Sequence, residues 1–130
     1  QHDAFMSINA CLEVDLWGQV ASESLGMSHF SGTGGQVDFV RGARESAGGK
    51  SFIAMPSTAK NGSISRINLS LRPGAIVSTS KNDVDYIVTE YGIAKMRGCT
   101  VHQRAQNLIA IAHPDFREIL RKEARKAHLM

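Results

Sequence analysis

Residues 83–114, DVDYIVTEYGIAKMRGCTVHQRAQNLIAIAHP, hold in one run the two kinds of element that decide the fold class. Their first eight residues are rich in β-branched and aromatic side chains, which predicts a strand that ends at Glu90. Thr100 and Gln103 have the spacing of a capping box, and apolar residues then recur at helical spacing. A strand followed by an amphipathic helix therefore places the chain among proteins that mix both elements.

One more helix is predicted before that amphipathic helix and one after it. Residues 91–98 are interpreted as a short helix closed by Gly98, since glycine often ends a helix. Pro114 suits the first position of a later helix, where its missing N–H costs nothing. The apolar stripe of that later helix, which we assign to the core, consists of Phe116, Ile119, Leu120 and Ala124.

The first two thirds of the chain predict mainly strands. Alternation of apolar and polar residues over 7–16 predicts a strand, and 36–47 can form a helix. A meander follows, with turns at Asn61-Gly62 and at Pro73-Gly74. Its strands are predicted at residues 51–59, 63–71 and 75–80. The fold class is therefore α/β, with α+β as the alternative: an open mixed sheet with flanking helices.

Composition limits the classes of protein to which the chain can belong. Its 130 residues suit one domain, and 42% hydrophobic with 21% charged residues is typical of a soluble globular protein. No apolar run reaches the roughly 20 residues of a membrane span. The basic residues near the C-terminus are interpreted as a solvated helix face, so we expect neither a nucleic-acid nor a membrane partner.

Cysteine and histidine usage gives no indication of a metal site. Cys11 and Cys99 are isolated, without the CxxC spacing of structural zinc sites, and the five histidines are scattered. Two isolated cysteines fit a reducing cytoplasm, so we expect a cytoplasmic protein without a metal. The opening Gln1-His2-Asp3 is not a natural start, so we expect the chain to be part of a longer protein.

The glycine-rich stretch SGTGGQVDF, residues 31–39, is a candidate anion-binding loop. A dinucleotide fingerprint would need a third glycine at position 37, where Val37 stands. A P-loop fails too, because Arg44 occupies the position of its first glycine. Backbone N–H groups at Gly34-Gly35 could instead converge on an oxyanion or carboxylate. A plain structural turn is the alternative, and the loop alone does not decide between them.

Several long motifs in order resemble one family. They are LEVDLWGQVASES, SGTGGQVDFVRGA, IAMPSTAKNGSISRI, LRPGAIVSTSKNDVDYIVTEYGIAKMRG and RAQNLIAIAHPDFREIL. Together they resemble the C-terminal half of the acetyl-CoA hydrolase/transferase family, particularly its 4-hydroxybutyrate CoA-transferase branch, over residues 8–125. The resemblance implies one half of a CoA-transferase-like fold. Residues 1–130 would then be the C-terminal domain of a longer two-domain subunit that forms a homodimer or larger assembly.

The resemblance also implies an activity. Such enzymes move coenzyme A from an acyl-CoA, such as acetyl- or butyryl-CoA, to a carboxylate such as acetate or 4-hydroxybutyrate. A glutamate attacks the thioester and becomes a glutamyl-CoA thioester, without a metal. That nucleophilic glutamate lies upstream of this chain in the family. The expected partners are therefore acyl-CoA, a small carboxylic acid and the N-terminal half of the same subunit, and the fragment alone should be inactive.

The family motifs assign roles to particular residues. Gly35 would donate its backbone N–H to the oxyanion of the thioester, and Lys60 would contact a CoA phosphate. Glu90 would be a second acidic residue that supports the active site, not the nucleophile. Residues that would contact CoA or substrate beside these are Ser31, Gly34 and Gln36.

Lys60 and Glu90 can also be interpreted as residues with a purely structural role. Lys60 could be a solvated turn lysine, and Glu90 a helix N-terminal carboxylate that interacts with the helix dipole. For the whole protein, the alternatives are an acyl-CoA hydrolase, in which water resolves the glutamyl thioester, and a non-catalytic CoA-binding or interaction domain.

Overall fold

The fold is seen in a computed structural model of the chain. It describes residues 6–22, 24–25, 28–29 and 49–130. The predicted helix over residues 36–47 and the glycine-rich loop lie outside the described residues.

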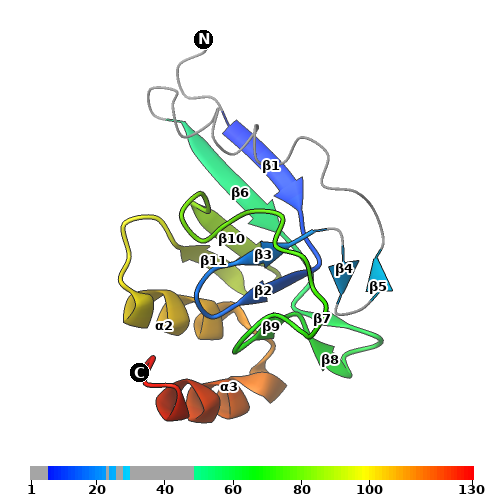
Figure 1. The fold of residues 1–130 in the computed structure, drawn as a ribbon, viewed down its shortest axis with the longest axis vertical. Coiled ribbons are helices and arrows are strands. Elements are labelled where there is room, and N and C mark those ends of the chain that lie inside the picture. The colour runs from blue at the N-terminus through cyan, green and yellow to red at the C-terminus, as the bar shows by residue number, and fades with distance from the viewer. Residues whose placement is uncertain (1–5, 23, 26–27, 30–48) are drawn as a thin grey trace.

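The main sheet has four strands in the order β1-β6-β10-β11 (Figure 1). The first three are parallel, and β11 is antiparallel to β10. Their bounds are Met6–Ala10 for β1, Lys50–Ala54 for β6, Tyr86–Thr89 for β10 and Gly92–Lys95 for β11. With two helices following the last strand, the predicted α/β class and mixed sheet are confirmed.

Two helices complete the chain, α2 (Val101–Ile111) and α3 (Pro114–Lys126). The Thr100 hydroxyl accepts a hydrogen bond from Gln103 N at 3.1 Å, and Thr100 N donates to Gln103 Oε1 at 2.8 Å. The predicted capping box is therefore present, as is the predicted helix start at Pro114. Neither helix is long and apolar enough to cross a membrane, a finding that covers only the described part of the chain.

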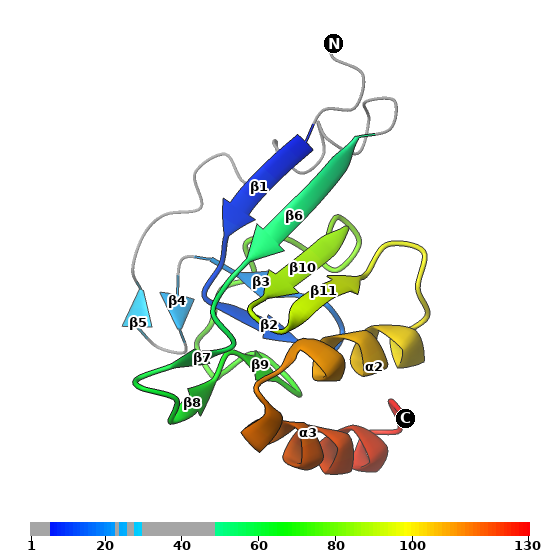
Figure 2. The same ribbon diagram turned by 180° about the vertical axis from the view of Figure 1, so that it is seen from behind.

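Helix α2 covers one face of the main sheet below β10 and β11 (Figure 2). Its residues Leu108 and Ile109 are buried, as are Ile53 and Ile87 on the same side of the sheet. The Thr89 hydroxyl donates to the carbonyl of the last residue of α2 at 2.6 Å and fixes the helix end to the sheet. The core therefore lies between this sheet face and the helices.

A second, smaller sheet has the order β3-β2-β9. Its strands are β2 (Glu13–Asp15), β3 (Val20–Ala21) and β9 (Ile67–Asn68). Two short hairpins stand beside it: β4 (Ser24–Leu25) with β5 (Ser28–His29), and β7 (Thr58–Ala59) with β8 (Ile64–Ser65) (Figure 1).

These small elements divide strands that the sequence predicted as continuous. Residues 7–16 split into β1 and β2, because the chain leaves the main sheet after Ala10 and enters the second sheet. Residues 51–59 split likewise where Met55, Pro56 and Ser57 leave the sheet edge. Periodicity alone cannot detect such a change of sheet, because both halves remain extended.

The acidic side chains of β2 are buried instead of facing solvent. Glu13 Oε2 accepts hydrogen bonds from Asn68 Nδ2 and from Arg72 N, both at 3.0 Å. The Asp15 carboxylate accepts from Trp17 N at 3.1 Å and from Gln19 N at 2.9 Å. Burial raises the pKa of both carboxyls, and these hydrogen bonds offset part of that rise. The two residues thus anchor the turn and the second sheet.

The predicted helix over residues 91–98 is wrong, because β11 occupies this stretch and forms a hairpin with β10. Gly92 has φ of 141°, outside the helical region, and follows a two-residue turn. Ala94 and Met96 are buried while Ile93 is 62% exposed, a period of two that belongs to a strand. The strand predicted over 75–80 is also wrong, since within it only Thr79 forms an isolated bridge.

Both predicted turns are confirmed. Asn61 and Gly62 have φ of 57° and 85°, and Ser63 N donates to Lys60 O at 3.2 Å. Ala75 N closes the other turn on Arg72 O at 3.0 Å, with Gly74 at φ 85° as a type II turn requires.

Adjacent residues of α3 give a test of the core. Leu120 is 2% exposed, whereas Ile119, predicted as core, is 58% exposed. We expect Leu120→Ala to lower the free energy of unfolding by about 2–5 kcal/mol, because it leaves a cavity. The matched Ile119→Ala should stay within about 0.5 kcal/mol. Urea unfolding followed by circular dichroism measures both, and equal losses would contradict this packing.

Candidate active site

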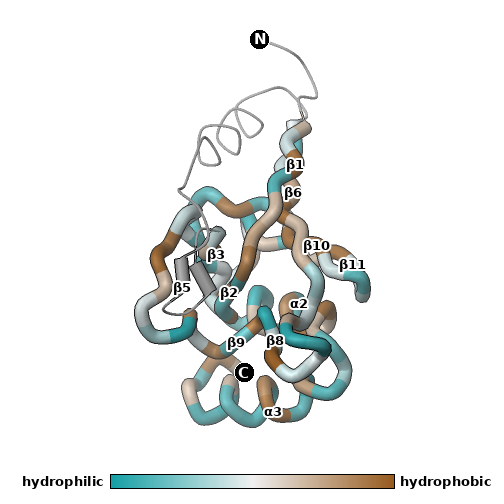
Figure 3. Tube along the Cα trace, turned by 90° about the vertical axis from the view of Figure 1, so that its right-hand side faces the viewer, coloured by the Kyte–Doolittle hydropathy of each residue, from teal (hydrophilic) through white to brown (hydrophobic). Residues whose placement is uncertain are grey.

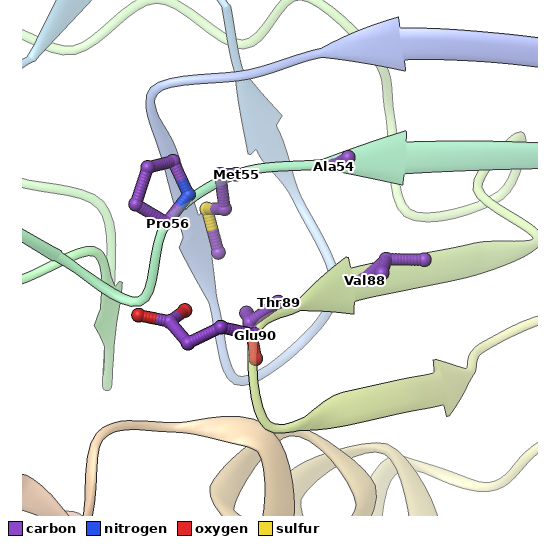
Figure 4. Close-up of a pocket in the computed structure, with 6 residues that line it drawn as sticks. All are labelled: Ala54, Met55, Pro56, Val88, Thr89 and Glu90. Atoms are coloured by element: carbon purple, nitrogen blue, oxygen red, sulfur yellow. The ribbon is translucent and has the colours of Figure 1, made fainter.

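A hollow of about 480 Å³ lies at the carboxyl ends of β6 and β10 (Figure 4). The two strands are adjacent and parallel, so the segments that follow them leave the sheet at the same edge. Ligands of open α/β sheets bind at this edge. The hollow is lined by Ala54, Met55, Pro56, Val88, Thr89 and Glu90.

The polar centre of this hollow is the carboxylate of Glu90. Glu90 Oε1 accepts a hydrogen bond from Ser57 N at 2.7 Å, and Glu90 Oε2 accepts from Ser57 Oγ at 3.1 Å. Figure 4 shows the side chain extending from the end of β10 toward the segment that follows β6. The pair therefore joins the ends of neighbouring strands, 33 residues apart in sequence.

Ser57 is itself held from several sides. It is fully buried, and its carbonyl accepts from Arg66 N at 2.9 Å. The Arg66 guanidinium donates to Thr58 O at 3.1 Å and to Leu12 O at 3.2 Å, which ties this segment to the second sheet. Sequence reasoning missed Ser57. The one local feature that could have pointed to Ser57 is that it is a polar residue just after an apolar strand, where ligands of open α/β sheets bind.

The Glu90 carboxylate is held in its ionised form. Partial desolvation favours the neutral acid, but the opposing contributions together are larger and lower the pKa of Glu90. They are hydrogen bonds from its own backbone N–H and from both donors of Ser57, with the nearby His113 imidazole. Glu90 precedes a strand, so its interpretation as a helix N-terminal carboxylate is wrong.

His113 reaches this region from the helical layer. It is the N-cap of α3, with Nδ1 accepting from Asp115 N at 3.1 Å, and its ring meets Tyr91 edge-on at 5.6 Å between centroids. No role at the site is predicted for His113 from the sequence. The structure brings it near Glu90 because the β10–β11 turn and the start of α3 lie side by side.

Of the other predicted site residues, only Lys60 lies among the described residues. Lys60 lies exposed at the tip of the β7–β8 hairpin, three residues after Ser57, with φ of 51°. Its contact with CoA stays a prediction. Ser31, Gly34, Gly35 and Gln36 lie outside the described residues, so their roles stay predictions too.

Among the described residues, neither the buried Cys11 nor a cluster of metal ligands offers a second site. Burial raises the pKa of the Cys11 thiol to about 12, which keeps it protonated at neutral pH. Within residues 6–22 and 49–130, no three His, Cys, Asp or Glu side chains cluster as metal ligands would. Glu90 is the one ionisable residue among those that line the hollow.

The hydrogen bonds to Glu90 can be tested by titration. Ser57→Ala removes the hydroxyl donor to Oε2, so we expect the pKa of Glu90 to rise toward its ordinary value. The matched Ser63→Ala, whose hydroxyl bonds Lys60 O in the hairpin, should leave it unchanged. Carboxyl chemical shifts of Glu90 followed against pH by NMR measure both variants. An unshifted Glu90 in Ser57→Ala would contradict the geometry.

Comparison with known proteins adds independent findings on the family. Residues 1–124 match the family model described as the acetyl-CoA hydrolase/transferase C-terminal domain. The chain is 64% identical to succinyl-CoA:cyclohexane-1-carboxylate CoA transferase of Geobacter metallireducens and 57% identical to 4-hydroxybutyrate coenzyme A transferase of Clostridium kluyveri. Each match covers 97% of this chain and 29% of the relative. The chain thus spans about three tenths of the length of these curated relatives.

A more distant relative and two solved structures are also similar to this chain. An acetyl-CoA hydrolase of Eremothecium gossypii is 32% identical over 88% of this chain and 22% of its own length. RipA from Yersinia pestis superposes with a TM-score of 0.91 at 46% identity, over 100% of this chain and 29% of RipA. A 4-hydroxybutyrate CoA-transferase from Porphyromonas gingivalis gives a TM-score of 0.77 at 50% identity, over 96% and 27%.

Proposed function

The chain belongs to the acetyl-CoA hydrolase/transferase family and corresponds to the C-terminal domain of that family. We propose that it is the C-terminal part of a CoA-transferase. The full subunit would move CoA from an acyl-CoA to a small carboxylic acid. The names of the relatives with 64% and 57% identity support this class of reaction. The observation that carries it is the Glu90 carboxylate, fixed by Ser57 in the hollow at the carboxyl edge.

The geometry of Glu90 favours a supporting role over that of the nucleophile. Both of its oxygens already accept hydrogen bonds from Ser57, and these bonds lower the nucleophilicity of the carboxylate. An ionised carboxylate with lone pairs still open can accept hydrogen bonds from a polar group of the substrate. Glu90 would therefore orient the acyl-CoA while a second glutamate, upstream of this chain, attacks.

The proposed reaction transfers CoA through the protein. The upstream glutamate attacks the thioester carbonyl, so that a mixed anhydride forms and the CoA thiolate leaves. The thiolate then attacks the glutamyl carbonyl of the anhydride, which gives the glutamyl-CoA thioester and releases the acyl group as a carboxylate. A second carboxylate accepts CoA by the reverse steps. In this proposal the Gly35 N–H stabilises the oxyanion, and Lys60 on its exposed hairpin contacts a CoA phosphate.

The supporting role of Glu90 and the nucleophilic role of the upstream glutamate can be tested in the full-length subunit. We expect Glu90→Gln to reduce CoA transfer by about 10–100-fold, the value of a hydrogen bond to a charged group. The covalent glutamyl-CoA thioester should still form, and mass spectrometry of the acyl-CoA-treated protein should locate it upstream of this chain. The control is Glu118→Gln, an exposed α3 residue paired with Arg121, which should retain full activity. An adduct on Glu90 itself would overturn the assignment.

Hydrolysis of the acyl-CoA is the second candidate, favoured by the relative named acetyl-CoA hydrolase. The two reactions differ only in whether a carboxylate or water resolves the glutamyl thioester. For a transferase, we expect the full-length subunit to consume butyryl-CoA rapidly only when acetate is added, with acetyl-CoA formed in equal amount. Consumption that is independent of acetate and releases free CoA would show a hydrolase. Free thiol and acyl-CoA species, followed over time, distinguish the two.

A further inference from the structure

Glu90 and Tyr91 form the two-residue turn between β10 and β11. Hairpin turns of this length are favoured when the first residue, or both, has a positive φ, because the turn then matches the twist of the strands. Neither Glu90 nor Tyr91 has a positive φ, so the backbone of this turn is not of the favoured kind. The turn that carries Glu90 therefore depends on contacts from outside the hairpin.

The ring of Tyr91 contacts two side chains from the start of α3. The His113 ring meets it edge-on, with 5.6 Å between centroids and 82° between planes. The Arg117 guanidinium lies over the ring, 5.3 Å from its centroid. Edge-to-face ring pairs and cations over an aromatic face are both attractive. We call these three residues the Tyr91 clamp.

The two α3 residues of the clamp are themselves fixed. Arg117 Nε donates to Ala112 O at 2.8 Å, so its side chain folds back onto the linker between α2 and α3. His113 Nδ1 accepts from Asp115 N at 3.1 Å, and the His113 ring also meets that of Phe116, with 6.2 Å between centroids. The clamp is thus built on a segment whose side chains are held in place.

A buried hydroxyl joins the same turn to the same linker. The Thr89 hydroxyl donates to Ile111 O at 2.6 Å and accepts from Tyr91 N at 3.1 Å. Thr89 is 6% exposed, so both bonds are shielded from water. Figure 2 shows the linker between α2 and α3 passing below the turn between β10 and β11. Glu90 therefore stands between two residues that are both anchored to the helical layer.

We propose that Tyr91 is a positioning residue for Glu90 in CoA transfer. Ser57 holds the carboxylate end of Glu90, and the clamp holds the backbone from which that side chain extends. Two anchors set the carboxylate in one place, whereas Ser57 alone would let the backbone of the turn move. This inference rests on the proposed function, in which Glu90 orients the acyl-CoA.

A double-mutant cycle in the full-length subunit tests this role. We expect Tyr91→Ala to lower kcat/KM for CoA transfer about tenfold, since misplacing a group at the site reduces the rate steeply. Tyr91→Phe keeps the ring and both of its contacts, so its kcat/KM should stay within about twofold of the wild type. In a Glu90→Ala background, Tyr91→Ala should cost less than about twofold, because its effect passes through the Glu90 carboxylate.

Three results of this cycle would overturn the role. Full activity of Tyr91→Ala would show that Glu90 does not need the clamp. An equal loss from Tyr91→Ala with and without the Glu90 carboxylate would show that Tyr91 acts on the fold or on the substrate directly. A tenfold loss in Tyr91→Phe would assign the effect to the hydroxyl instead of the ring. The Tm of each variant verifies that it is folded.

The cation of the clamp has a matched control on the same helix. Arg117→Ala removes the charge over the Tyr91 ring and should lower kcat/KM about threefold. Arg121 lies one turn further along α3 and contacts Glu118 Oε1 at 3.3 Å instead, so Arg121→Ala should retain full activity. Much of α3 is hydrophilic (Figure 3), so both substitutions leave a helix of the same character. Equal activity of the two variants would contradict the clamp.

Hydrogen–deuterium exchange separates this inference from the proposed function, because it needs no activity. In the full-length subunit, peptides with residues 89–92 should exchange faster in Tyr91→Ala than in the wild type or in Tyr91→Phe. Peptides with residues 13–21, in the second sheet, should exchange at the wild-type rate in all three. Mass spectrometry of the labelled peptides measures both regions.

The outcomes for the two ideas then differ. Unchanged exchange at residues 89–92 would overturn this inference, while CoA transfer by the wild type would still support the proposed function. Without CoA transfer by the wild type, the proposed function fails, and the role of Tyr91 in that reaction fails with it. Faster exchange would in that case support only the hold of Tyr91 on the turn.

Discussion

The structure depends on the parallel pairing of β6 with β10. Because both strands run the same way, the segments after them leave the sheet at one edge, and Ser57 meets Glu90 there. Two hydrogen bonds from one serine then fix the carboxylate and lower its pKa. A single antiparallel reversal would separate these residues by the length of a strand, and the hollow would have no charged group.

The second sheet supports this arrangement from behind. Arg66 connects the segment after β6 to the loop before β2, and the buried carboxylates Glu13 and Asp15 hold the surrounding turns by accepting backbone N–H groups. Burying these acids costs desolvation energy, which their hydrogen bonds offset in part. These contacts hold the segment of Ser57, and through Ser57 they fix the orientation of the Glu90 carboxylate.

The chain also has the features of one part of a larger whole. Its core lies on the side of α2, whereas Met6, Ile8 and Ile93 on the other face of the main sheet are exposed. The same side of the molecule carries the hollow with Glu90.

The sequence by itself determined the features that depend on neighbours within a few positions. The capping box of Thr100, the helix start at Pro114 and the turn at Asn61-Gly62 all formed as predicted, because their hydrogen bonds and backbone angles are local. The ordered family motifs also identified the family. Glu90 was recognised as a candidate through those motifs, whereas its partner Ser57 was not.

Only the tertiary structure decided the features that depend on distant contacts. Residues 92–95 became a strand because β10 offered a hydrogen-bonding edge, although their pattern had predicted a helix. Ser57 met Glu90 across 33 residues, and the apolar side of β1 turned outward, because strand pairing assigns each side chain to a face. Periodicity shows which residues share a face, but the packing of the whole chain decides which face is covered.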